Sequence, residues 1–171
     1  MTLLTDAVRA YIGVRSDPVT APDKVERSEV RRYSQAIMDD DAIYHSSEAA
    51  ERYDGAVAPA LFPTMMFRRD FGAADVLTDQ AGNPDFDGTS GGSSTLPPLP
   101  LGKLALLNGG SEAEFFRYVR HGETVIMQSR YADIYEKQSS KGPMLFVIME
   151  TEYRTGDGEV LMRNRQTVIR R

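Results

Sequence analysis

Three stretches near the end of the chain decide its fold: TVIMQSRYADIYEK (124–137), PMLFVIMETEYRT (143–155) and VLMRNRQTVIRR (160–171). All three are rich in β-branched and aromatic residues. The first alternates over 125–131, where Val, Met, Ser and Tyr fall at every second position, and the third alternates over 160–168. A period of two is the signature of a strand whose two faces differ. The three stretches are therefore predicted to be β-strands.

A fourth strand is predicted just before them, at 112–119. Turns separate the four strands at 120–123, 138–142 and 156–158, and the last turn, Gly-Asp-Gly, is a strong hairpin signal. Strands of about 12 residues exceed the usual five or six. A helix at 28–38, with Ser28 as its N-cap, precedes them. Long antiparallel strands that follow a helical half indicate an α+β hot-dog fold, in which a long curved sheet wraps around a central helix.

The chain is predicted to be one domain, residues 1–171, with a long loop inserted at about 72–101. At 171 residues it is long enough to bury a core of its own. The insertion is rich in Gly, Ser, Asp and Pro. Loops longer than about 12–15 residues in a compact domain are usually functional or disordered.

Composition excludes several classes of function. The net charge of −5 argues against nucleic acid as a partner, since phosphate binding needs a basic excess. With no Cys and only two His, disulfides, thiolate catalysis and a His-rich or Cys-ligated metal site are not expected. No stretch reaches the roughly 18–20 apolar residues of a membrane span, and the N-terminus lacks a signal-peptide pattern. The expected location is the cytoplasm, without membrane attachment.

Four stretches, taken in order and spacing, carry a resemblance to a known family. They are 25–36, 39–45 with 55–59, 107–117 with 121–123, and 131–137 with the closing Arg-rich strand. In this combination the chain resembles the MaoC-like dehydratases, and more narrowly their FAS1-like N-terminal dehydratase domains. The resemblance covers nearly the whole chain.

The resemblance implies chemistry on acyl thioesters. The family hydrates a trans-2-enoyl thioester or dehydrates the 3-hydroxyacyl form, (R)-specifically, with coenzyme A or a carrier-protein pantetheine as the handle. It implies no metal and no organic cofactor. The reaction needs a carboxylate and an imidazole to manage one water, and a backbone N–H group to polarise the thioester carbonyl.

This chain departs from the family's catalytic motif, Asp-x-Asn-Pro-x-His. Asp39 fits the Asp, but Asp41 and Ala42 replace Asn and Pro, and Tyr44 stands where the His belongs. His45 comes one residue late. A Tyr at this place is typical of the FAS1-like domains, which resemble the supporting half of a double hot-dog. The missing imidazole therefore predicts a second MaoC-like hot-dog subunit that supplies the catalytic pair.

The candidate site residues follow from this alignment with the motif. The catalytic candidates are Asp39 and His45. His121 is interpreted as an ordinary hairpin residue. The arginines at 68, 69, 163, 165, 170 and 171 have two interpretations, coenzyme A phosphates or a solvated strand face. The candidates for binding the substrate are Tyr44, Gly55, Val57, Ala58, Pro59, Asn108, Gly109 and Gly110, of which the two glycine-containing stretches suit either the pantetheine arm or the partner chain.

Three alternatives stay open. The chain is a self-sufficient homodimeric enoyl-CoA hydratase that uses Asp39 with His45, or a purely structural acyl-thioester-binding subunit, or, less simply, a hot-dog thioesterase. The insertion at 72–101 covers an enlarged acyl pocket, reaches over the partner, or is disordered. The acyl group, and the direction of the reaction in the cell, are not encoded in any residue pattern.

Overall fold

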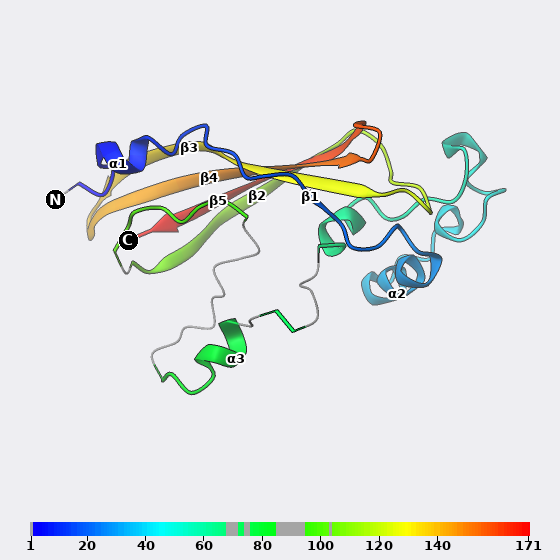
Figure 1. The fold of residues 1–171 in the computed structure, drawn as a ribbon, viewed down its shortest axis with the longest axis horizontal. Coiled ribbons are helices and arrows are strands. Elements are labelled where there is room, and N and C mark those ends of the chain that lie inside the picture. Colours follow the sequence, from blue (N-terminus) through cyan, green and yellow to red (C-terminus); the bar gives the residue numbers. More distant parts are fainter. Residues whose placement is uncertain (1, 68–71, 74–75, 85–94, 103) are drawn as a thin grey trace.

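A computed structural model describes residues 2–67, 72–73, 76–84, 95–102 and 104–171 of the chain (Figure 1). In chain order its elements are α1 (Asp6–Arg9), β1 (Val19–Thr20), α2 (Arg27–Ile37), η1 (Ala42–Tyr44), η2 (Glu51–Tyr53), η3 (Phe62–Met65), α3 (Val76–Gln80), β2 (Leu106–Phe115), β3 (Val125–Ser139), β4 (Gly142–Thr155) and β5 (Val160–Arg170), where η marks a 3₁₀ helix. Arg68, Arg69 and parts of the predicted insertion, 74–75 and 85–94, lie outside the described residues.

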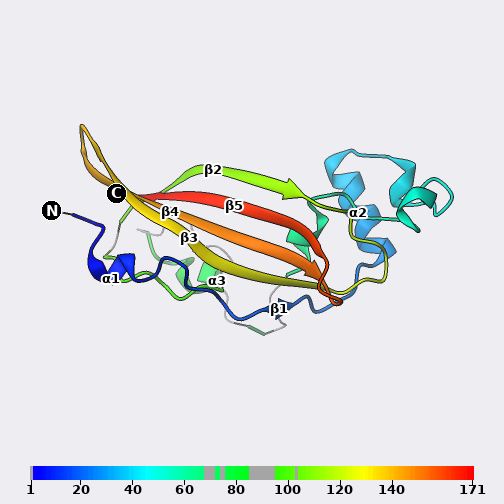
Figure 2. The same cartoon turned by 90° about the horizontal axis from the view of Figure 1, so that it is seen from above.

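The five strands form one sheet in the order β1-β3-β4-β5-β2, and every pairing is antiparallel. Figure 2 shows the four long strands side by side, with β1 along one edge and β2 along the other. The predicted strands at 124–137, 143–155 and 160–171 are confirmed as β3, β4 and β5.

The fourth predicted strand has different bounds. It begins at Leu106 and ends at Phe115, so the predicted start at 112 was six residues too late. The reason is a bulge at the glycines 109 and 110, which interrupts the alternation that identifies a strand in the sequence. The register against β5 shifts between Asn108 and Gly110, and the Asn108 side chain accepts a hydrogen bond from the Gly110 N–H at 3.0 Å. Gly110 has a φ of +124°, which favours glycine.

Helix α2 begins two residues earlier than the predicted N-cap implies. Its N-cap is Glu26, which makes no side-chain capping bond, so the prediction of Ser28 as the N-cap was wrong. The helix ends at Ile37, and Met38 adopts a left-handed conformation with a φ of 57°. Val30 is fully buried, whereas Met38 is 92% exposed. In Figures 1 and 2, α2 lies at one end of the sheet and not across its middle.

The core occupies one face of the sheet. Strand β4 shows why: Leu145, Val147 and Tyr153 are buried on this face, and the residues between them point the other way. One cluster at the α2 end includes Val30, Val57, Val125 and Leu161, and a second includes Val8, Leu96, Ile134 and Leu145. Each of these side chains stabilises the fold by roughly 1.5–3 kcal/mol.

The last part of the predicted insertion is packed and not open. Leu96 is buried against the second cluster, and Leu99 and Leu101 pack beside it. The Tyr131 hydroxyl donates a hydrogen bond to the Pro97 carbonyl oxygen at 2.9 Å, which ties the segment to β3. Earlier in the insertion the short helix α3 interrupts the predicted loop.

Candidate functional site

The Asp39–Tyr44 pair lies in the loop that leads from α2 into η1. The Tyr44 hydroxyl donates a hydrogen bond to Asp39 Oδ2 at 3.0 Å, and Asp39 Oδ1 accepts one from the Asp41 backbone at 3.3 Å. Tyr44 is buried, while Asp39 is partly exposed. Burial raises the pKa of Tyr44 above its ordinary value, and the hydrogen bond to Asp39 acts in the same direction. Tyr44 is therefore a fixed hydrogen-bond donor at neutral pH, and it does not accept a proton there.

His45 is next in the chain but makes a different set of contacts. It is the C-cap of η1, and its backbone N–H donates to the Ala42 carbonyl at 3.0 Å. Its ring meets the Tyr44 ring edge-on, with 6.3 Å between centroids. The hydrogen bond that Asp39 receives from a side chain comes from Tyr44 and not from His45. The two catalytic candidates, Asp39 and His45, thus lie in one loop without direct pairing.

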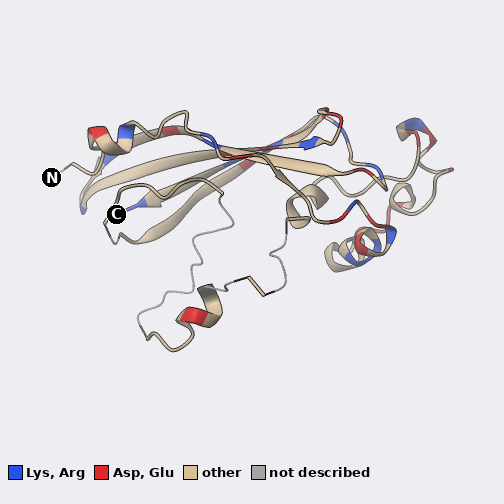
Figure 3. Ribbon diagram, in the orientation of Figure 1, with Lys and Arg blue, Asp and Glu red and all other residues tan. Residues whose placement is uncertain are grey.

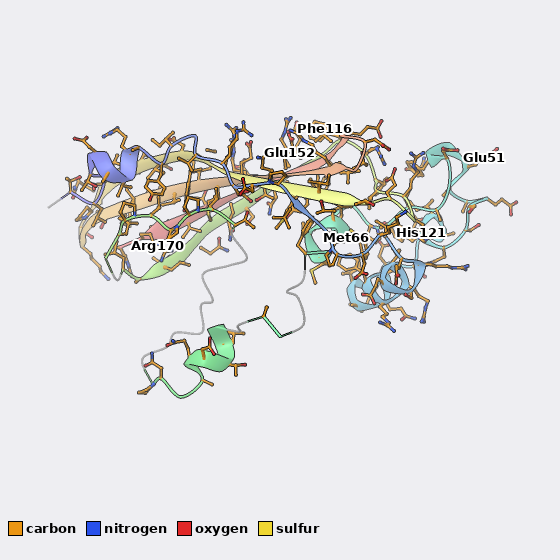
Figure 4. The ribbon with its side chains drawn as sticks, viewed as in Figure 1. Glu51, Met66, Phe116, His121, Glu152 and Arg170 are labelled. Carbon is orange, nitrogen blue, oxygen red and sulfur yellow. The ribbon has the colours of Figure 1, made fainter. Side chains whose placement is uncertain are left out.

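His121 reaches the same region from the turn between β2 and β3, and it is a functional candidate that the sequence did not reveal. Its backbone N–H donates to the Ala56 carbonyl at 3.1 Å, and its Nε2 atom is buried without a hydrogen-bond partner among the described residues. Burial lowers the pKa of His121, and nearby His45 and Arg27 act in the same direction. Figure 4 shows His121 at the α2 end of the sheet. Because the contact between His121 and Ala56 joins residues far apart in the sequence, no local sequence pattern predicts it.

A cluster of ion pairs fixes this turn. Glu123 lies between two arginines: Arg117 Nη2 is 2.9 Å and Arg120 Nη2 is 3.2 Å from its Oε1 atom. Arg117 also pairs with Glu159 at 2.7 Å, and Arg120 pairs with Asp54 at 2.8 Å. Although burial acts to raise it, the hydrogen bonds from the two arginines hold the pKa of Glu123 below its ordinary value. The cluster joins the turn of His121 to the loop that precedes Gly55.

The stretch from Gly55 to Pro59 is mostly core. Val57 and Ala58 are fully buried, and Pro59 is buried too. Their amides are already engaged: Val57 N–H donates to the Ile43 carbonyl at 3.1 Å, and Ala58 N–H to the Val119 carbonyl at 2.8 Å. Those two amides are not available to polarise a thioester carbonyl. Gly55 is the open point of the stretch, with a φ of +122° and no neighbour within 4 Å of the place where a Cβ would lie.

The stretch from Asn108 to Gly110 lies elsewhere. It belongs to the start of β2, at the opposite end of the sheet from α2 (Figure 1). Gly109 packs so closely on β5 that an added Cβ would lie 2.8 Å from Thr167 Cγ2. The structure therefore brings together Asp39, Tyr44, His45 and Gly55–Pro59, and it leaves Asn108–Gly110 on the edge strand.

Two general properties of the described residues bear on the site. Within the described ranges, no group of three or more His, Cys, Asp or Glu side chains has an arrangement that suits a metal ion. Likewise, none of the helices in the part of the chain that the structure describes is long and apolar enough to cross a membrane.

Comparison with protein families gives a match that spans most of the chain. Residues 10–164 match the family model described as "FAS1-like, dehydratase domain region". The match includes the Asp39–Tyr44 loop, the turn of His121 and nearly the whole sheet.

Solved structures with a similar fold agree. The ChsH1–ChsH2 complex from Mycobacterium tuberculosis matches with 20% identity and a TM-score of 0.67, over 95% of this chain and 85% of that chain. The C-terminally truncated HadBC (3R-hydroxyacyl-ACP dehydratase) complex from the same organism matches with 20% identity and a TM-score of 0.58, over 93% and 96%. A MaoC-like dehydratase from Rhodospirillum rubrum matches with 19% identity and a TM-score of 0.61, over 94% and 93%. The predicted α+β hot-dog fold is confirmed by this likeness and by the antiparallel sheet.

Proposed function

The chain belongs to the family of FAS1-like dehydratase domains, within the MaoC-like hot-dog dehydratases, and we propose that it is the substrate-binding half of a two-chain enzyme. The enzyme hydrates an enoyl thioester (R)-specifically or dehydrates the corresponding 3-hydroxyacyl thioester. Coenzyme A or a carrier-protein pantetheine is the handle of the substrate, and no resident cofactor takes part. A second MaoC-like hot-dog chain supplies the Asp/His pair.

The observation that carries the proposal is the hydrogen bond from Tyr44 to Asp39. Where the family's motif has an imidazole, this chain has a buried phenol whose pKa is raised. A general base must take up a proton near neutral pH, and a phenol held in its protonated form does not. Tyr44 therefore orders Asp39, and the proton transfers fall to another chain.

Two observations support a partner subunit. Two of the similar solved structures are complexes named for two components, ChsH1 with ChsH2 and the HadBC dehydratase. In addition, within the described part of the chain β2 pairs with β5 alone, and nearly all residues of β2 are exposed. An open edge of ten residues presents unpaired N–H and C=O groups to a further strand. In this proposal Asn108–Gly110 on that edge serve the partner contact, and Gly55 faces the thioester.

The test is hydration of a short enoyl-CoA, followed as loss of the conjugated thioester absorbance. The purified chain, a MaoC-like chain encoded beside its gene, and the mixture of the two are compared. Turnover in the mixture alone, retained in the mixture when Asp39→Asn is introduced here, is the expected result. Turnover by the isolated chain that is lost in Asp39→Asn and His45→Gln overturns the proposal in favour of a homodimeric hydratase.

A purely structural subunit is the remaining alternative, and a kinetic measurement separates it. If this chain forms part of the pocket, Gly55→Ala should raise the KM of the mixture. Because a φ of +122° strains any side chain at this position, thermal melts and the molar mass of the mixture verify that the variant folds and assembles. An unchanged KM in a folded and assembled variant contradicts a role in substrate binding.

A further inference from the structure

The face of the sheet opposite the core, here called the outer face, carries side chains in regular transverse rows. One row runs from β3 to β2 through Arg130, Glu150, Arg165 and Glu112, which are directly opposite one another on neighbouring strands. The next row runs through Gln128, Glu152, Arg163 and Glu114. Figure 3 shows acidic and basic residues intermixed over the strands, and in Figure 4 Glu152 and Phe116 stand on the side away from Met66.

The two central carboxylates of these rows are clasped by arginines. Glu150 lies 2.8 Å from Arg130 and 3.1 Å from Arg165, and its side chain is only 14% exposed. Glu152 is 16% exposed and lies 2.7 Å from Arg163. Arg163 and Arg165 thus pair with sheet carboxylates, while their side chains remain 41% and 49% exposed. The alternation of signs is thus fixed in place.

Of the charged side chains that line the hollow of the outer face, two have no ion-pair partner among the described residues, and they lie at opposite rims. Arg15 forms a backbone bridge to Arg130, beyond the β3 edge, and Glu112 lies on β2 at the other edge. Both side chains line one open hollow of about 770 Å³ that runs across the rows. Four strand spacings separate them, roughly 19 Å, so they do not pair within one chain.

A twofold axis parallel to the strands, between β4 and β5, makes this pattern complementary to itself. Such an axis reverses the order of each row, so Arg130, Glu150, Arg165 and Glu112 of one copy meet Glu112, Arg165, Glu150 and Arg130 of the other. Every position then faces the opposite sign. Glu112 also comes next to Arg15 of the other copy, so that both unpaired charges gain a partner.

The same twofold axis also brings apolar residues of the outer face opposite one another. A third row consists of Tyr135, Phe146, Ile169 and Leu107. The Tyr135 and Phe146 rings are stacked with 5.0 Å between centroids. Reversal lays this row on itself, apolar against apolar. Two sheets of the same twist also nest under such an axis, as aligned sheet packings do.

We propose that the outer face binds a second copy of this chain, in an isologous contact about this twofold axis. The occupant is a second copy because the row order makes the face complementary to itself. This contact is separate from the β2 edge and does not depend on the proposed enzymatic function.

Charge-exchange variants test this self-association, with the molar mass measured by light scattering across a range of protein and salt concentrations. Glu112→Arg and Arg15→Glu should each weaken self-association at least tenfold, since each puts like charges face to face. The double variant should recover part of the lost self-association, because the exchanged charges at 15 and 112 attract each other while the arginine introduced at 112 still faces Arg130. Glu48→Arg, the same substitution on an exposed site away from the sheet, should leave the mass unchanged, and thermal melts verify that all variants fold.

The double variant distinguishes the possible interfaces. If self-association used the β2 edge instead, Glu112→Arg would weaken it, but adding Arg15→Glu would not restore it, because Arg15 lies beyond the opposite edge. Wild-type chain that stays monomeric at every concentration overturns the proposal, and so does a double variant no better than either single one. Because the measurement is mass and not turnover, its failure leaves the proposed function untouched.

Discussion

Glu123→Gln probes the ion-pair cluster that holds the turn of His121. The Glu123 carboxylate accepts five hydrogen bonds: two from the Arg117 guanidinium, two from the Arg120 guanidinium, and one from the Arg120 backbone at 2.8 Å. Its side chain is 18% exposed. Glutamine keeps the size and one acceptor oxygen, but it removes the charge and turns an NH₂ group toward arginine donors.

The expected magnitude lies between two limits. Exposed ion pairs contribute about 0–1 kcal/mol, and breaking a fully buried pair costs about 3–5 kcal/mol. At 18% exposure, with charge-assisted bonds, we expect the free energy of unfolding to fall by about 2 kcal/mol. For a chain of 171 residues this lowers Tm by about 4–8 °C.

The matched control is Glu159→Gln. Glu159 pairs with the same arginine, Arg117, but is 64% exposed, so we expect a loss of about 0.5 kcal/mol. Urea denaturation followed by circular dichroism measures both variants. Because the pKa of Glu123 is lowered, its contribution is present above its unfolded value of 4.5 and is lost as pH falls through the folded value. Equal losses in the two variants, or a difference that persists in strong acid, would refute the reasoning.

Three further predictions concern single residues. Gly109→Ala should destabilise the fold by about 1–3 kcal/mol, because the added Cβ would lie 2.8 Å from a methyl group on β5. Gly102→Ala, with open space around it, should stay within about 0.5 kcal/mol of the wild-type free energy of unfolding in the same urea assay. Tyr44→Phe should cost about 1–2 kcal/mol through loss of the hydrogen bond to Asp39, and an unchanged urea midpoint would argue against that bond. His121→Gln should flatten the fall of Tm below pH 6.5. Because the folded-state pKa of His121 is lowered, the unfolded chain binds more protons, and stability decreases as pH drops from 6.5 toward the folded-state pKa. A slope parallel to that of the wild type would contradict this prediction.

The sequence predicted the strands well because their evidence is local. In β3, Val125, Met127 and Tyr131 fall at every second position of the sequence, and all three are buried on one face. The same rule failed at the start of β2, where the bulge at Gly110 breaks the alternation. At the end of α2, the predicted helix included Met38, but the helix ends at Ile37 and a left-handed C-cap turns Met38 into solvent.

The candidate site was predicted in part. Asp39 and Tyr44 emerged from one short motif, and the structure pairs them directly. The place of Val57 and Ala58 in the core, with both amides engaged, depends on Ile43 and Val119, which no nearby pattern specifies. His121 joins the site because its backbone bonds to Ala56, and because Arg120, which also pairs with Glu123, pairs with Asp54 in the loop before Gly55.

By itself, then, the sequence determined the elements with a strong period and the short motif near Asp39, because side-chain direction within one strand or turn follows from backbone geometry. Only the tertiary structure decided which strand lies beside which. Row order on the outer face, such as Glu150 between Arg130 and Arg165, depends on the registers of three strands at once. Registers are set by bulges, turns and the burial of the opposite face, and these are properties of the whole sheet.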